Sequence, residues 1–74
     1  MEKRINLKVL RTRHNLTQEE MAKKCGIHRG GYSLIEAGTR SGTPRFWLNL
    51  KTAFDLTPDE LFKIQYEIHL SKQE

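Results

Sequence analysis

The sequence lacks the features that are typical of secreted and membrane proteins. It has 74 residues and a single cysteine, Cys25, so no disulfide can form within the chain, as is usual in a reducing compartment. It has no run of about 18 apolar residues, the length that a membrane-spanning helix needs. It also lacks a signal-peptide pattern. These absences predict a cytoplasmic protein without a membrane partner.

Residues that carry catalysis or bind metals are sparse and scattered. The three histidines and Cys25 do not have the spacing of a zinc site. The sequence contains no phosphate-binding glycine loop, and its Ser, His, Asp and Cys residues form no recognisable catalytic set. We therefore expect neither an enzyme nor a metal, cofactor or small-molecule ligand.

The charge is unevenly distributed along the chain. Residues 1–45 hold ten Lys or Arg against four Asp or Glu, and residues 46–74 hold three against five, so net charges of +6 and −2 make up the total of +4. A basic front half is suited to a polyanion. On charge alone, a solvated surface of mixed charge fits equally well. The length and the absence of repeats predict one domain over residues 1–64 and a tail over residues 65–74.

The strongest local pattern lies between residues 17 and 38. Thr17 and Glu20 have the spacing of a capping box, so a helix is expected to begin at Gln18. Gly26 provides the positive φ that ends this helix, and Gly38 ends a second one. The buried positions recur at helical spacing: Met21, Ala22 and Cys25, then Ile27, Tyr32 and Ile35. Two short helices joined by a glycine turn predict a helix-turn-helix.

This pattern resembles the lambda-repressor-like family, also called the Xre or Cro/C1-type helix-turn-helix family. The matching segments are residues 7–11, 16–22, 26–27 and 35–38. Residues 44–62 resemble the last two helices of lambdoid phage repressors. The resemblance implies an all-α fold, a compact five-helix DNA-binding domain. It also implies that the helix over residues 28–37 reads the major groove of double-stranded DNA.

Capping residues predict where the other helices begin. The first helix is expected over residues 6–13, with Asn6 as the candidate N-cap. Thr43-Pro44 and Thr57-Pro58 each combine a capping threonine with a proline at the first helical position. The apolar stripes of these two helices are Phe46, Trp47, Leu50, Ala53 and Phe54, and then Leu61, Phe62 and Ile64. Residues 39–42 are expected to form a polar loop.

The tail has two competing patterns. Residues 64–70 alternate apolar and polar side chains, as a β-strand does, whereas Leu61, Ile64 and Ile68 share one helical face. We favour a short extended segment after Lys63 or Gln65, with a longer fifth helix as the alternative. A lone strand is unstable in water, so the tail of a second subunit is its expected partner.

The outward residues of the second motif helix are the candidate base contacts. The Arg29 fork matches O6 and N7 of guanine, although a contact to phosphate or water alone is the alternative. Ser33 suits a base or a phosphate, and Leu34 suits a thymine methyl group. His28, at the start of the helix, is the candidate phosphate contact.

Gly30 and Gly31 depart from the family pattern, which has larger residues at these positions. Each glycine inside a helix costs about 1 kcal/mol relative to alanine. One interpretation is that Gly30 and Gly31 allow the helix backbone to approach DNA closely. The other is that the helix starts late and is poorly ordered without DNA. In both cases DNA shape or bound water must supply more of the specificity.

The resemblance also implies contacts to the DNA backbone. Gln18 matches a phosphate-binding glutamine of the family, and Arg45 falls near the narrowed minor groove. Arg40 lies close by, with a solvated loop charge as the alternative, and the Thr43 hydroxyl can donate to a phosphate. Arg11 and Glu36 match a family salt bridge, which we expect to tie two helices together rather than to contact DNA.

We expect a homodimer, because one recognition helix reads too few base pairs for a useful operator. The resemblance places a dimer contact at Trp47 and residues 55–58, and the alternating tail adds Tyr66, Ile68 and Leu70. Packing of the tail on its own domain is the alternative.

The predicted function is transcriptional regulation by a phage or mobile-element Cro/C1-type repressor in the bacterial nucleoid, bound to a near-palindromic operator. A restriction–modification controller protein and an antitoxin whose tail binds a toxin are the alternatives. A toxin-binding tail is usually longer and disordered until bound, unlike this short, regularly patterned one.

Overall fold

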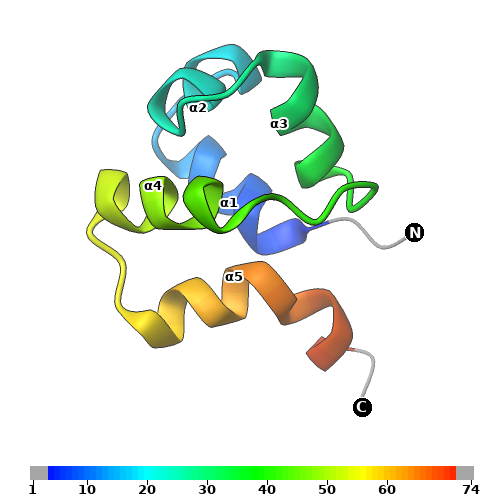
Figure 1. Cartoon of the computed structure of the whole chain (residues 1–74). Helices are drawn as coiled ribbons and strands as arrows, with labels where there is room; N and C mark the ends of the chain where they lie inside the picture. The colour runs from blue at the N-terminus through cyan, green and yellow to red at the C-terminus, as the bar shows by residue number, and fades with distance from the viewer. Residues whose placement is uncertain (1–3, 72–74) are drawn as a thin grey trace.

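The computed structural model describes residues 4–71, with side chains for residues 4–66. The five helices in this part are α1 (Ile5–Arg13), α2 (Gln18–Lys24), α3 (Arg29–Glu36), α4 (Pro44–Phe54) and α5 (Pro58–Ser71). Within the described residues there is no strand, so the predicted all-α five-helix fold is confirmed. Figure 1 shows α2 and α3 at one end, α1 and α4 across the middle and α5 at the other end.

Threonine caps fix the starts of three helices, as the sequence predicts. Thr17 Oγ1 accepts a hydrogen bond from the Glu20 backbone N–H (3.1 Å), and the Glu20 carboxylate accepts one from the Thr17 N–H (2.8 Å). Thr57 and Glu60 form the same reciprocal pair before α5. Thr43 caps α4 through the Phe46 N–H (3.1 Å). These local bonds satisfy amide groups that a helix cannot pair internally.

The start of α1 differs from the prediction. The helix begins at Ile5 with Arg4 at the N-cap position, so Asn6 lies inside the helix and is not its cap. Arg4 makes no capping bond through its side chain; instead its backbone N–H donates to the Glu36 carbonyl (2.9 Å). A contact from the end of α3 therefore fixes this end of α1, which no local pattern could have indicated.

Side chains from all five helices form one core. Its buried members are Leu7, Met21, Ala22, Cys25, Tyr32, Ile35, Phe46, Trp47, Leu50 and Ile64. Ala53 and Phe62, which the helical stripes place in the core, are exposed instead. Burial raises the pKa of the Cys25 thiol to about 11, so this group stays protonated in the folded protein.

The turn between α2 and α3 depends on glycine, as predicted. Gly26 has a φ of 73°, in the left-handed region that side chains disfavour. A Cβ atom at this position would lie 3.3 Å from Nδ2 of Asn49, the same amide that donates to the Cys25 carbonyl (3.0 Å). The side-chain amide of Asn49, on α4, thus holds the end of α2 and leaves little room for a side chain at Gly26.

The extended segment that we favoured for the tail is wrong, because α5 continues as a helix through Ser71. Leu61 and Ile64 are three residues apart and pack against the core, which requires helical rather than alternating geometry. A helix also satisfies its own backbone groups and needs no partner strand. The side chains of Ile68 and Leu70 lie outside the described residues. No helix in the described part of the chain is long and apolar enough to cross a membrane.

Candidate nucleic-acid interface

The two helices of the predicted motif pack against each other and present one face of α3 outward. The turn between them is closed by the Ile27 N–H, which donates to the Ala22 carbonyl (3.0 Å). Tyr32 and Ile35 of α3 are buried in the core, whereas His28, Arg29 and Leu34 are exposed. Ser33 and Ala37 are half-buried beside them. This division matches the inward and outward faces that the sequence predicts for this helix.

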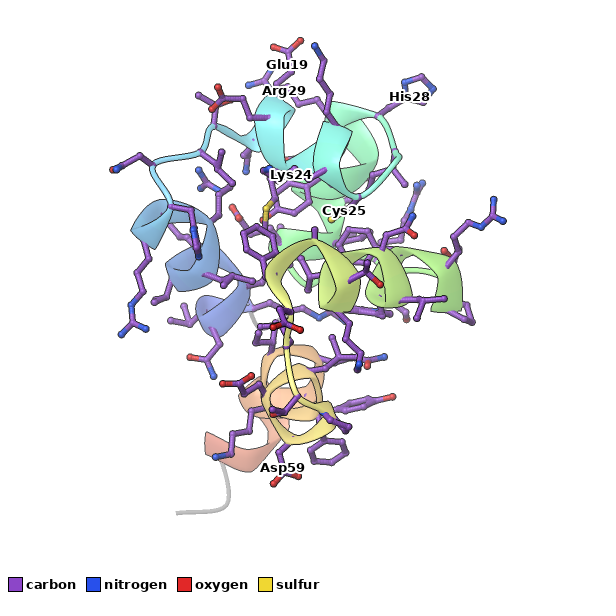
Figure 2. All side chains as sticks on the ribbon, turned by 90° about the vertical axis from the view of Figure 1, so that its left-hand side faces the viewer. Glu19, Lys24, Cys25, His28, Arg29 and Asp59 are labelled. Atoms are coloured by element: carbon purple, nitrogen blue, oxygen red, sulfur yellow. The ribbon has the colours of Figure 1, made fainter. Side chains whose placement is uncertain are left out.

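The start of α3 forms a projecting end of the molecule. Figure 2 shows His28 and Arg29 at the end built by α2 and α3, together with Glu19, while Asp59 of α5 lies at the opposite end. His28 is the N-cap residue of α3, and its side chain makes no capping hydrogen bond. The His28 imidazole therefore points away from the helix that it begins and is exposed for an outside contact.

Gly30 and Gly31 lie inside the first turn of α3, which begins at Arg29. The interpretation that the helix starts late is therefore wrong. A Cβ atom on Gly30 would have no neighbour within 4 Å among the described residues. One on Gly31 would lie 3.9 Å from Arg40 Nη1 and Ile27 Cδ1, an ordinary contact. The packing of the protein itself thus does not require glycine at either position.

A buried carboxylate joins three helices behind this face. The expected ion pair is present: Arg11 Nε of α1 donates to Glu36 Oε2 at 2.8 Å. Tyr32 Oη donates to the same oxygen (2.7 Å), and Gln18 Nε2 of α2 donates to Oε1 (2.9 Å). Glu36 is only 7% exposed, so these donors replace the water that it has lost.

The electrostatics of this network favour the charged form of Glu36. Burial alone would raise the pKa of Glu36, but hydrogen bonds from Arg11, Tyr32 and Gln18 outweigh burial and hold that pKa below its usual value. The bond to Glu36 raises the pKa of Arg11 in turn, and burial raises the pKa of the Tyr32 hydroxyl. The pair therefore stays charged over the ordinary pH range and holds α1 and α2 against α3.

Gln18, the predicted phosphate contact, is held by Glu36. An amide nitrogen carries two hydrogens, so the bond to Glu36 leaves a second donor on Nε2. This amide borders a cleft of about 390 Å³ between α1 and α3, which Lys8 and Ser33 also line. Lys8 was not predicted as a site residue because it lies outside the helix-turn-helix motif. It lies three residues before Arg11, so the two side chains are neighbours on one face of α1, and this spacing was the available signal.

The loop after α3 places a cation, Arg40, beside α3, in addition to Lys8. Because Arg40 Nη1 lies 3.9 Å from the Cβ position of Gly31, the Arg40 guanidinium lies beside the first turn of α3. His28, Arg40 and Thr43 also border a groove of about 610 Å³ between α3, this loop and α4. Arg45 is exposed at the start of α4 but does not line that groove. The predicted contacts thus fall on both sides of the exposed face of α3.

A helix-turn-helix family model matches residues 7–61, which is most of the chain. The chain belongs to the lambda-repressor-like helix-turn-helix family. It is 38% identical over 58 residues to YqaE of Bacillus subtilis (strain 168), an uncharacterized HTH-type transcriptional regulator. This match covers 78% of the chain and 50% of YqaE, so the chain spans about half the length of this relative. No solved structure matches the chain significantly.

The dimer contact that the family resemblance implies at Trp47 conflicts with the structure. Trp47 is only 4% exposed, its Nε1 donates to the Ser41 carbonyl (3.0 Å), and its ring packs on Phe46. A side chain buried in this way has almost no surface left for a second subunit. Within the 55–58 segment, Asp55, Thr57 and Pro58 are exposed and Leu56 packs toward the core.

In this family member, exposed aromatic surface is found on α5 instead. Tyr66 is 43% exposed and Phe62 is 52% exposed, and their ring centroids lie 5.0 Å apart. They are four residues apart and so share one helix face. Tyr66 was predicted from the tail pattern. Phe62 was predicted to belong to the core stripe with Leu61 and Ile64, but it is exposed.

Proposed function

We propose that this protein binds double-stranded DNA sequence-specifically and regulates transcription as a Cro/C1-type repressor of a phage or mobile element. The observation that carries the proposal is the exposed first turn of α3. It has no side chains at Gly30 and Gly31, and the Arg40 guanidinium lies beside it. The cleft lined by Gln18 and Lys8 borders the later part of the same helix, at Ser33 and Ala37. A helix that has few bulky side chains at its start and cations on both sides is suited to the DNA major groove, which is bordered by phosphates on both sides.

In this proposal the outward side chains of α3 read the bases. Arg29 pairs with O6 and N7 of a guanine, Ser33 with a base edge or phosphate, and Leu34 with a thymine methyl group. All three are at least partly exposed on the outward side of α3. His28 contacts a phosphate, which suits an exposed residue at a helix start.

The contacts to the DNA backbone come from residues around α3. Gln18 uses its second amide hydrogen, and Arg40, Thr43 and Arg45 bind from the loop and from the start of α4. Thr43 Oγ1 already accepts the capping bond from Phe46, so its hydroxyl hydrogen remains for a phosphate. These contacts add affinity for any sequence and position the reading helix.

We further propose that the protein binds a near-palindromic operator as a homodimer, with half-sites about 34 Å apart. Phe62 and Tyr66 on α5 support this assembly, because paired aromatic side chains on a surface are typical of protein interfaces. Ile68 and Leu70 stay part of the proposed contact as predictions from the sequence. Helix packing on α5 replaces the strand pairing that we expected for the tail.

Selection of bound sites from random duplex DNA tests this function. We expect wild type to select one near-palindromic motif, and Arg29→Ala to lose preference at one or two base pairs in each half-site, a cost of about 1–3 kcal/mol. Arg13→Ala is the matched control, because Arg13 is exposed on α1 beside α5, away from the α3 face. Selection of no motif by wild type would refute the function. An unchanged motif with Arg29→Ala would refute the readout by Arg29.

A further inference from the structure

Arg4 is a buried arginine that neither the helix-turn-helix motif nor its DNA contacts require. It is 9% exposed, and within the described part of the chain its guanidinium donates three hydrogen bonds to backbone carbonyls. Nη1 donates to Ile35 O (2.6 Å) and to Arg40 O (2.9 Å), and Nε donates to Gln65 O (3.3 Å). Its guanidinium carbon also lies 5.3 Å from the centroid of the Trp47 ring.

These acceptors belong to parts of the chain that are far apart in sequence. Ile35 is in the last turn of α3, Arg40 is in the following loop, and Gln65 is in α5. One nitrogen, Nη1, bridges the first two. Backbone bonds join the same two parts of the chain, since the Arg40 N–H donates to the Leu34 carbonyl of α3 (3.2 Å). Arg4 therefore adds a side-chain bridge from the start of α1 to this junction.

Burial of this kind is unusual for a cation. Burial lowers the pKa of Arg4, but guanidinium remains charged at any ordinary pH. Among the described residues, the contacts found for it are carbonyl oxygens and an aromatic ring rather than a carboxylate. The carbonyl of Ile35 lies at the negative end of the α3 dipole, which favours a cation there.

We propose that Arg4 is a positioning residue for DNA binding, which holds the loop that carries Arg40 against the end of the recognition helix. The inference rests on the proposed contact between Arg40 and a DNA phosphate. The Arg40 carbonyl accepts from Arg4 Nη1, and the Arg40 guanidinium lies beside Gly31, near the start of α3. Without the bridge, the loop keeps its backbone bonds to the Leu34 carbonyl but loses this side-chain bond. The Arg40 side chain then has more freedom to lose on binding DNA, which lowers affinity.

The guanidinium group of Arg4, with N–H donors on several nitrogens, matters in this role, not the charge alone. A lysine at this position keeps the positive charge but has one nitrogen, which cannot reproduce the Nη1 and Nε bonds together. Arg4→Lys therefore separates positioning from a general attraction to DNA. Arg4→Met removes the charge and the hydrogen bonds but keeps much of the length of the side chain.

The test is a double-mutant cycle on Arg4 and Arg40, with affinity for the selected operator measured across a salt series. We expect Arg40→Ala to lower affinity and to reduce the salt slope by about 0.9 per subunit, the amount for one phosphate contact. Arg4→Met and Arg4→Lys should each weaken binding roughly fivefold and reduce the slope in the same direction. Either Arg4 change added to Arg40→Ala should cause little further loss, because both act through one contact.

Controls separate positioning from stability. Circular dichroism at the assay temperature establishes whether each variant is folded. If Arg4→Met is unfolded, the cycle is carried out with Arg4→Lys. Arg13→Met removes an exposed α1 cation near α5 and should leave the salt slope unchanged. A loss of stability alone lowers the melting temperature and would not make the effects of Arg4 and Arg40 overlap.

The outcomes are distinct. Additive losses from Arg4 and Arg40, or wild-type affinity with Arg4→Lys, would overturn the positioning inference and leave the proposed function standing. An unchanged salt slope with Arg40→Ala would instead remove the proposed phosphate contact and the inference with it.

Discussion

The exposed faces of α3 and α5 have opposite chemistry. The outward face of α3 carries Arg29, Ser33 and one apolar residue, Leu34, and has no side chains at Gly30 and Gly31. Cations lie on both of its sides. The outward face of α5 carries the neighbouring, mutually tilted rings of Phe62 and Tyr66. A narrow polar face fits a polyanion groove, whereas an aromatic face gains most by leaving water. In the proposed function, α3 binds DNA and α5 binds a second subunit, at opposite ends of one small domain.

The interior contacts of the two helices differ as well. Behind α3, Glu36 is buried in a charged network with Arg11, Tyr32 and Gln18. α5 is held mainly by the apolar side chains Leu61 and Ile64. The position of α3 should therefore depend on pH and on single charges, whereas the position of α5 should depend on burial of apolar area.

The largest effect is expected from breaking the network behind α3. Arg11→Met leaves Glu36 charged and buried with only neutral donors, which should cost about 3–5 kcal/mol of unfolding free energy. Glu36→Gln should also destabilise the fold, since Arg11 then loses its counter-charge. Urea unfolding measures both changes, with Arg13→Met as the control. Unchanged midpoints for both variants would contradict the claim that this pair ties α1 to α3.

The same network predicts acid sensitivity. Because the pKa of folded Glu36 lies below its ordinary value of 4.5, its contribution to stability is complete above that value and is lost as the pH falls through the lower folded pKa. Glu36→Gln should show a smaller loss of stability between neutral pH and pH values below 4.5. An identical pH profile for wild type and this variant would assign acid unfolding to other groups.

The second-largest effect is expected from removing the aromatic pair on α5. Phe62→Ser together with Tyr66→Ser removes exposed rings, so the monomer should stay folded. Operator affinity should fall on the order of a hundredfold, because two linked half-sites become independent. Analytical ultracentrifugation measures the oligomeric state, and Leu48→Ser, on the exposed surface of α4, is the control. A double variant that still sediments as a dimer would place the interface elsewhere.

The smallest effect is expected from adding a methyl group at Gly30, on the outward face of α3. Gly30→Ala fills space that is open in the protein, so it should raise stability by up to about 0.5–1 kcal/mol. If DNA approaches the helix backbone here, the same methyl group should weaken operator binding. Gly31→Ala, where a Cβ atom makes ordinary contacts, is the companion variant. Tighter binding with Gly30→Ala would show that the glycine does not provide close approach.

How far the sequence predicts this molecule depends on the range of the contacts. The starts of α2, α4 and α5 were predictable because Thr17, Thr43 and Thr57 bond to groups only three residues away. The faces of α3 followed from the helical spacing of Tyr32 and Ile35. The tail was predicted wrongly because its residues fit both strand alternation and one helical face, and local spacing does not decide between them. Packing of Ile64 in the core agrees with the helix.

The candidate site shows the same limit. Arg11 and Glu36 came from family resemblance, but the Gln18 and Tyr32 bonds to the same carboxylate did not. Arg4 had no local signal at all, since its partners are 31 to 61 residues away in sequence. Trp47 was placed at an interface by resemblance, although its bond to Ser41 and its burial depend on how this particular loop folds.

The buried Cys25 thiol can be used as a probe of local unfolding. Cys25 is the single cysteine, it is fully buried between the helices of the motif, and its raised pKa keeps it unreactive. A thiol reagent can therefore label the protein only when the packing of α2 opens. The labelling rate with and without operator DNA would measure, in the natural sequence, how much DNA suppresses that opening.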